Sequence, residues 1–394
     1  MYTDIGDRDY ERAAAALGVT ARSVATPVIA DQDEMYRLGL KAVRSSSPLI
    51  QGKIIVDHFF KPVEPQMCEA AMALVDRSDL VVGHFFMHHL RAAAERAGKP
   101  EVSVTFAHTM VPSRFIHPAG GPRLGPVGDA ISWRLARFAL NRLWLADINR
   151  FRRRLGVPPA RDMMLDVWAS HLLNLIAVSP ALCPTPADWP EANRVSGFLA
   201  LPAHDHESVS PEVERFLADG PPPVFMGFGS LMPTRLDHLF DTIELLRDAA
   251  RRAGCRAIIQ ANLPPSAADG DDAIIVGRTS HAALFPRCAA VVHHAGAGTT
   301  HSTLRAGVPS VPVPHLSDQY GWADDLHRAG AAPAGIPRRS LTAHTLARRI
   351  IETLASPGMR SRAHALQREM AGDDGVANGA RLIDEAAGVA NRGD

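Results

Sequence analysis

Residues 291–300, VVHHAGAGTT, constrain the fold of this chain more than any other stretch. The apolar run 289–292 predicts a buried strand, and Gly296 and Gly298 predict a tight turn after it. Two threonines then begin a short helix that we expect to end at Gly307. Such a unit directs unpaired backbone N–H groups and the positive end of a helix dipole toward one point. The sequence therefore predicts an anion site here, and a diphosphate suits it.

The rest of the second half alternates strands with helices. Apolar runs that precede helical patterns lie at 224–228, 256–260, 273–276 and 310–313. Regular alternation of this kind predicts a parallel sheet with helices on both faces. Ahead of these runs, Ser210 and Pro211 are suited to cap and open a helix, which Gly220 and three prolines end. We therefore expect a domain boundary there.

The first half alternates more loosely, with predicted strands at 79–82, 102–106 and 175–179. Sites in such folds lie at the carboxyl ends of strands, so we expect His84, His108 and the loop 110–128 to face a cleft. A domain of this kind normally opens with a strand, a loop and a helix. That unit, roughly 30 residues or more, is missing before the helical pattern at 9–17. Either the chain is shortened at its amino terminus or it truly lacks the unit.

Length and composition set further bounds. At 394 residues the chain is long enough for two domains of roughly 200 residues each. Lys plus Arg and Asp plus Glu both number 42, which argues against a nucleic-acid partner. No apolar run reaches the ~18 residues that span a bilayer, and the first residues form no signal peptide. The scattered cysteines favour a reduced cytoplasm over a disulfide framework or a zinc site: Cys68, Cys183, Cys255 and Cys288. We therefore expect a cytoplasmic protein.

A long helix is predicted over 131–155. Its apolar stripe at helical spacing consists of Ile131, Leu135, Phe138, Leu145, Ile148, Phe151 and Leu155. Seven arginines lie in the same stretch against the single acid Asp147. The simpler interpretation is a solvated basic face on a core helix. The alternative is contact with a membrane surface or an anionic acceptor.

Three histidines raise the question of a metal site. His84 and His88 have i,i+4 spacing, and His89 follows directly. However, the stretch contains no HExxH motif and shows no third ligand. We therefore expect no metal ion.

Three other motifs allow both a structural and a functional interpretation. The turn GFGS at 227–230 needs glycine for backbone reasons, yet Ser230 could also donate to a phosphate or sugar oxygen. One of His293 and His294 must lie at the mouth of the anion turn, where an imidazole N–H can donate to a diphosphate. Asp318 is suited to cap a helix, or to bind sugar hydroxyls together with Gln319.

Together, GFGS, the stretch VGRTSHAALFPRCAAVVHHAGAGTTHSTLRAGVPSVPVPHLSDQ and IPRRSLT resemble the UDP-glycosyltransferase superfamily. The bacterial branch of sterol-glucosyltransferase-like and natural-product enzymes is the most similar. The resemblance is dense over 222–353 and looser over 78–114 and 175–199. It implies the α/β GT-B architecture, two facing Rossmann-like domains with parallel sheets. The implied parts are an acceptor-side domain 1–200, a linker 201–222 and a nucleotide-sugar-binding domain 223–372. A helix over 373–394 is expected to cross back to the N-terminal domain.

The resemblance also implies roles for single residues. His294 matches the histidine that contacts the diphosphate, and Asp318 and Gln319 match the pair that binds sugar hydroxyls. The other implied phosphate contacts are Gly229, Ser230, Gly296, Gly298, Thr299 and Thr300.

The nucleotide end of the donor matches the family less completely. Arg278 and Thr279 stand where the family surrounds the nucleobase, without the aromatic residue that plant members stack there. Ser302 stands where plant members use a glutamate on the ribose. The resemblance therefore leaves UDP and TDP both open.

The implied reaction is inverting, metal-independent transfer of a hexose from a UDP- or TDP-sugar to a hydroxyl of a small hydrophobic acceptor: a lipid, a sterol or a secondary metabolite. The nucleotide sugar is a co-substrate, and we expect no cofactor. The family's usual base lies in the missing unit, so we hypothesise that His84 lies in the acceptor cleft as a substitute. The alternatives are a donor-binding auxiliary protein, an amino-terminally truncated enzyme and a nucleotide-sugar epimerase.

Overall fold

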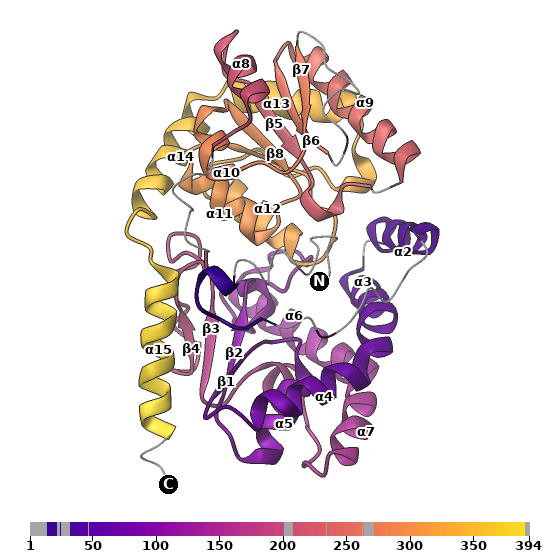
Figure 1. Ribbon diagram of the computed structural model, residues 1–394, viewed down its shortest axis with the longest axis vertical. Coiled ribbons are helices and arrows are strands. Elements are labelled where there is room, and N and C mark those ends of the chain that lie inside the picture. The colour runs from indigo at the N-terminus through magenta and orange to yellow at the C-terminus, as the bar shows by residue number, and fades with distance from the viewer. Residues whose placement is uncertain are drawn as a thin grey trace.

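The structure is a computed structural model that describes residues 14–21, 24, 32–45, 47–200, 208–233, 235–261, 263 and 272–390. These residues form two α/β domains, which lie one above the other in Figure 1. Each domain has its own parallel sheet, with four strands in the N-terminal domain and five in the C-terminal domain. The expected fold class is confirmed.

The N-terminal sheet has the strand order β1-β2-β3-β4, and each neighbouring pair is parallel. Its strands are β1 Val81–His84, β2 Glu101–Thr105, β3 Leu173–Ile176 and β4 Asn193–Val195. Its main helices are α2 Gln32–Arg44, α3 Pro48–Ile55, α4 Glu64–Val75, α5 His88–Ala97, α6 Gly125–Leu140 and α7 Ala146–Arg154. Because the strands are parallel, their carboxyl ends share one edge of the sheet, which faces the other domain in Figure 1.

The expected single helix at 131–155 is wrong in two respects. A π-helical turn, Asn141–Leu145, separates α6 from α7. The expected apolar stripe is also buried only in its second half: Phe151 is 5% exposed, whereas Ile131, Leu135 and Phe138 are 50%, 64% and 71% exposed. Trp133 and Trp144 face the core in their place. The exposed apolar face lies beside exposed arginines, as a helix at a membrane surface would require, so the membrane alternative stays a prediction.

The C-terminal sheet has the order β7-β6-β5-β8-β9 and is also entirely parallel. Its strands are β5 Val224–Gly227, β6 Ala257–Gln260, β7 Ala273–Val276, β8 Ala290–His293 and β9 Ser310–Pro312. Its helices are α8 Pro211–Ala218, α9 Leu236–Ala253, α10 His281–Leu284, α11 Ala297–Arg305, α12 Asp318–Arg328, α13 Ala343–Leu354 and α14 Pro357–Glu369. Helices α9 and α13 pack in one apolar cluster on the sheet, and α8 and α10 pack in another.

One apolar core joins the two domains. Ile176 and Leu182 from the N-terminal domain pack in the same cluster as Leu304 and Trp322 from the C-terminal domain. Trp322 is 1% exposed, although it lies on the helix α12 at the domain boundary. The cluster is therefore shared by both domains and holds α12 against the N-terminal domain.

The last helix, α15 Gly375–Ala390, returns to the N-terminal domain and runs along its left side in Figure 1. Its Leu382 packs in one cluster with residues of β2 and β3. The helix begins against Gly197, which has a φ of +93° that favours glycine. The two backbone segments touch so closely that neither position has room for a side chain.

Replacing Gly375 with alanine should destabilise the protein. The new methyl group would lie 2.4 Å from the Phe198 carbonyl oxygen and 2.5 Å from the Gly197 carbonyl carbon, both backbone atoms. Overpacking of this kind costs about 1–3 kcal/mol, so we expect a loss of that size in the unfolding free energy measured by guanidinium titration.

The matched control is Gly379→Ala on the same helix. There the nearest atom, Leu199 Cδ2, is 3.6 Å from the added methyl group, an ordinary contact. Because alanine favours a helix over glycine by roughly 0.5–1 kcal/mol, this variant should match or exceed the wild type. Equal unfolding free energies for the two variants would contradict the packing described for Gly375.

Candidate active site

The two glycine-rich turns predicted from the sequence meet around one imidazole ring. Strands β5 and β8 are neighbours, with Gly227 opposite His293, so the turns that follow them lie side by side. A Cβ atom on Gly229 would lie 3.2 Å from His294 Cε1, and one on Gly296 would lie 2.4 Å from His294 Nε2. The His294 ring therefore lies between the two turns, and glycine at both positions leaves room for it.

Helix α11 begins directly after this ring. Gly296 is the N-cap, and the helix starts at Ala297, two residues before the predicted start at Thr299. The Thr300 N–H already donates to the Gly296 carbonyl at 2.9 Å, so the unused N–H groups belong to the residues before it. Gly298 is exposed, whereas Thr300 is completely buried. Thr300 therefore lies beneath the turn and not on its open face.

Both histidines of the pair are neutral at neutral pH. Burial lowers the pKa of His293 to about 3 and that of His294 to about 4. His293 is completely buried, and its Nδ1 accepts a hydrogen bond from the Ala295 N–H at 3.1 Å. This bond supports Ala295 at a φ of 59°, an uncommon value for a residue with a side chain. His293 thus supports the turn, and His294 is the member of the pair at the mouth.

The predicted sugar-binding pair opens helix α12. Burial raises the pKa of Asp318 to about 6. The Gln319 side-chain oxygen accepts the N–H groups of His315 at 2.8 Å and Leu316 at 3.1 Å. This amide oxygen is therefore used by the preceding loop, which leaves the Gln319 NH2 group for a ligand.

The remaining predicted donor residues lie at the same edge of the sheet. Arg278 and Thr279 follow β7, two strands away from β5, and Arg278 is exposed. Ser280 caps the next helix by accepting the Ala283 N–H at 3.3 Å, as the sequence predicted. Ser230 lies in the short turn Gly229–Leu231, and its side chain is outside the described part of the protein. Because the sheet is parallel, the carboxyl ends of its strands lie along one edge, and these residues follow them there.

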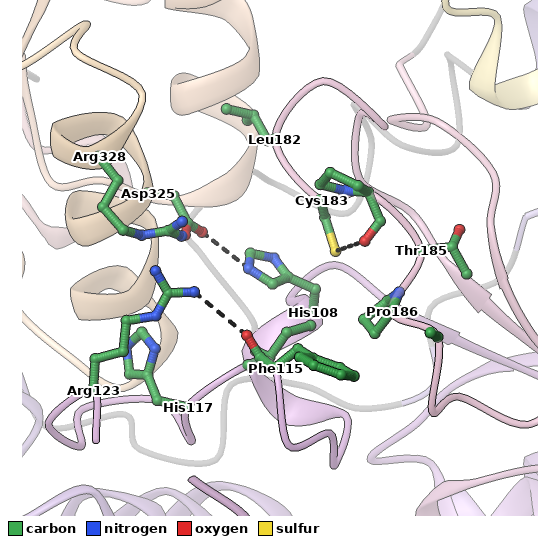
Figure 2. Close-up of a pocket in the computed structure, with 13 residues that line it drawn as sticks. His108, Phe115, His117, Arg123, Leu182, Cys183, Thr185, Pro186, Asp325 and Arg328 are labelled. Atoms are coloured by element: carbon green, nitrogen blue, oxygen red, sulfur yellow. Dashed lines mark hydrogen bonds and ion pairs between the residues drawn. The ribbon is translucent and has the colours of Figure 1, made fainter. Parts of the chain in front are cut away.

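A cavity of about 360 Å³ lies between the domains, further along α12. It is formed by the loops after β2 and β3 and by the second half of α12 (Figure 2). None of the predicted donor residues lines it. Its polar lining includes His108, which the sequence placed at a cleft, together with His117, Arg123, Asp325 and Arg328.

His108 and Asp325 face each other across the domain boundary in Figure 2. His108 Nε2 lies 3.0 Å from Asp325 Oδ2, and the two residues are 4% and 3% exposed. Burial alone would raise the pKa of Asp325, but His108 and Arg328 hold it below its usual value. His108 Nδ1 is buried and has no hydrogen-bond partner. A second histidine of the same loop, His117, lies with its Nε2 3.7 Å from Asp324 Oδ2.

Sequence reasoning missed Asp325, because its partner comes from the other domain. Two adjacent acids inside a helix give no sign of what they face.

The hypothesis for His84 finds less support in the geometry. His84 ends β1 with an exposed side chain that stacks near Phe86 and Phe106, at ring-centroid distances of 6.0 and 5.9 Å. It does not line the interdomain cavity.

None of the helices in the described ranges has the length and apolar character that a bilayer crossing needs.

Comparison with known proteins identifies the family of this chain. A family profile described as the C-terminal domain of erythromycin biosynthesis protein CIII-like proteins matches residues 257–381. O-mycaminosyltylonolide 6-deoxyallosyltransferase of Streptomyces fradiae is 35% identical over 275 residues, 68% of this chain and 64% of the relative. Vancomycin aglycone glucosyltransferase of Amycolatopsis orientalis is 32% identical over 312 residues, 75% of this chain and 71% of the relative.

Among solved structures, the glycotransferase of kitacinnamycin superimposes with a TM-score of 0.64 at 19% identity, over 95% of this chain and 89% of that one. This likeness identifies the fold as GT-B. The chain therefore belongs to the UDP-glycosyltransferase superfamily, in the branch that acts on natural products.

Proposed function

We propose that the protein transfers a hexose from a UDP- or TDP-sugar to a hydroxyl of a small hydrophobic acceptor, such as a lipid, a sterol or a secondary metabolite. One observation carries the proposal: the His294 ring lies between Gly229 and Gly296, directly before the N-terminus of α11. The relatives whose names mention a tylonolide and a vancomycin aglycone support a natural-product acceptor.

The donor turn suits a leaving diphosphate. Its neutral imidazole can donate one N–H, and the first N–H groups of α11 add the positive end of a helix dipole. These donors are in place before charge develops on the leaving group, the arrangement that stabilises such transition states most. We propose that they neutralise the diphosphate without a metal ion, and that the acceptor displaces it with inversion.

We propose His108 as the group that takes the acceptor proton, in place of His84. Asp325 lies against Nε2 and would hold the imidazole proton on that nitrogen, which leaves the Nδ1 lone pair as the base. Nδ1 has no partner, and the residue lines the interdomain cavity, where an acceptor hydroxyl could enter.

The test is a screen of nucleotide sugars and hydroxylated acceptors by mass spectrometry, run on the wild type, His108→Asn and His84→Asn. We expect glycoside from the wild type and from His84→Asn. A lost general base lowers kcat by roughly 100-fold or more, so His108→Asn should form little product while its UDP affinity is unchanged.

Other results would point elsewhere. Loss of product in His84→Asn with normal turnover in His108→Asn would restore the first hypothesis for the base. UDP binding without any glycoside would favour an auxiliary protein, and an isomerised donor without acceptor would favour an epimerase.

Gly298→Ala should separate donor binding from stability. A methyl group at Gly298 meets only Phe198 Cζ, at 4.0 Å, so the free protein has room for it. If the diphosphate approaches this backbone, the same methyl group blocks it. We expect an unchanged or higher unfolding free energy, and UDP affinity weakened about tenfold or more by calorimetry, about 1.4 kcal/mol. The control is Gly379→Ala, which should leave the UDP affinity unchanged. Normal UDP binding by Gly298→Ala would refute the proposed diphosphate position.

The sugar part of the donor should bind in a pH-dependent way. A carboxylate accepts hydrogen bonds from sugar hydroxyls, whereas the protonated group is a poorer acceptor, and the pKa of Asp318 is about 6. The affinity for a UDP-sugar, relative to UDP, should therefore rise about tenfold from pH 5 to pH 7, because the ionised fraction rises by that factor.

Asp318→Asn checks the sign of this effect. It should flatten the pH profile of sugar binding. Because the pKa of Asp318 is raised in the folded state, the unfolding free energy of the wild type falls as pH rises through about 6. The variant should therefore be more stable than the wild type at pH 8 and no more stable at pH 4. A pH-independent affinity ratio in the wild type would remove Asp318 from the sugar site.

A further inference from the structure

Two neighbouring helices of the N-terminal domain bring a carboxylate and two imidazoles together, away from the donor turn. Glu64 opens α4, and His88 and His89 open α5. One potential ligand atom from each residue lies within 4.8 Å of the others. The sequence showed the histidines without a third ligand. The fold supplies that ligand, because α4 and α5 pack in one apolar cluster through Ala71, Val75 and Ala93.

Three ring nitrogens of this group are buried without a hydrogen-bond partner among the residues that the structure describes. His89 is 1% exposed, and neither of its ring nitrogens has a hydrogen-bond partner. His88 Nδ1 is likewise buried without a partner. Buried polar atoms are satisfied in nearly all cases, so three unpartnered ring nitrogens at one place require an explanation. A bound cation would engage one nitrogen of each ring.

The packing around the rings holds them in place. Their centroids are 3.7 Å apart at an interplanar angle of 34°. Phe151 presents its ring edge-on to both, at 5.1 Å from His88 and 5.3 Å from His89. A rigid pair of imidazoles close together is a better start for a metal site than two mobile side chains.

The nearest charged neighbours do not supply a substitute partner. The Arg152 guanidinium binds both carboxylate oxygens of Glu95, at 2.8 and 2.7 Å, and the Pro158 carbonyl at 2.7 Å. Arg152 is therefore occupied and carries its own counter-charge. No hydrogen bond or ion pair found among the described residues engages the Glu64 carboxylate, the one negative ligand of the group.

We propose that Glu64, His88 and His89 bind one divalent transition-metal ion, with water as the fourth ligand, in a site that ties α4 to α5. Two imidazoles and one carboxylate suit Zn²⁺ and exclude ions that require only oxygen ligands, such as Mg²⁺. The site contains none of the donor residues, so its role is to stabilise the N-terminal domain. It does not depend on the proposed glycosyl transfer.

The test measures metal content in the full chain. The purified protein is stripped with a chelator, dialysed against Zn²⁺ at micromolar concentration and analysed by mass spectrometry for zinc per chain. We expect one zinc ion in the wild type and a loss of at least about tenfold in affinity in Glu64→Gln and in His89→Asn. Glu69→Gln on the same helix and His171→Asn, both at exposed positions, should keep the ion.

Thermal unfolding provides a second measurement, in case His89→Asn folds poorly. Zn²⁺ should raise the melting temperature of the wild type and of the two controls, because it binds the folded state, but not that of Glu64→Gln. A Co²⁺-loaded wild type should show the visible absorption of a tetrahedral site. No bound zinc in the wild type, or equal zinc in Glu64→Gln and the wild type, would overturn the proposal.

Discussion

The packing of Trp322 between the two domains is the contact on which the rest of the site depends. Asp318, Trp322 and Asp325 stand at i, i+4 and i+7 on α12, so they share one face of the helix. That face presents a carboxylate at the donor edge, an indole to the shared core and a second carboxylate to His108. Because one helix carries all three, the geometry of that helix fixes the spacing between the donor edge and the interdomain cavity.

At the proposed donor edge, an anion would be bound through dipoles more than through charged side chains. Burial lowers the pKa of His301 to about 4 and that of His315 to about 3, as it does for the His293–His294 pair. These imidazoles are therefore neutral at neutral pH, and His293, His301 and His315 bind backbone groups. Charge complementarity with the diphosphate then comes from N–H groups and the start of α11, which do not titrate.

The sequence predicted best those parts of the structure that residues close together in the chain determine. The strand, turn and helix at residues 289–307 are determined by neighbouring residues, and their positions differ from expectation by no more than two residues. The apolar face of α6 was assigned wrongly because periodicity offers two apolar stripes, and only packing selects the one with Trp133 and Trp144. The contacts of His108 with Asp325 and of Glu64 with His89 could not be predicted, because each joins segments that only the tertiary fold brings together.

Gly197, shortly before the C-terminal domain begins, touches Gly375, the first residue of the helix that returns to the N-terminal domain. Next to this point, Ser179 donates its N–H to His301 Nε2 at 3.1 Å, and its hydroxyl bonds Asp373. These contacts therefore attach both α11, through His301, and the segment before α15, through Asp373, to the same residue of the N-terminal domain. Because α11 begins at the donor turn, a substitution of Ser179 should disturb that turn as well as the attachment of α15, although Ser179 lies in the other domain.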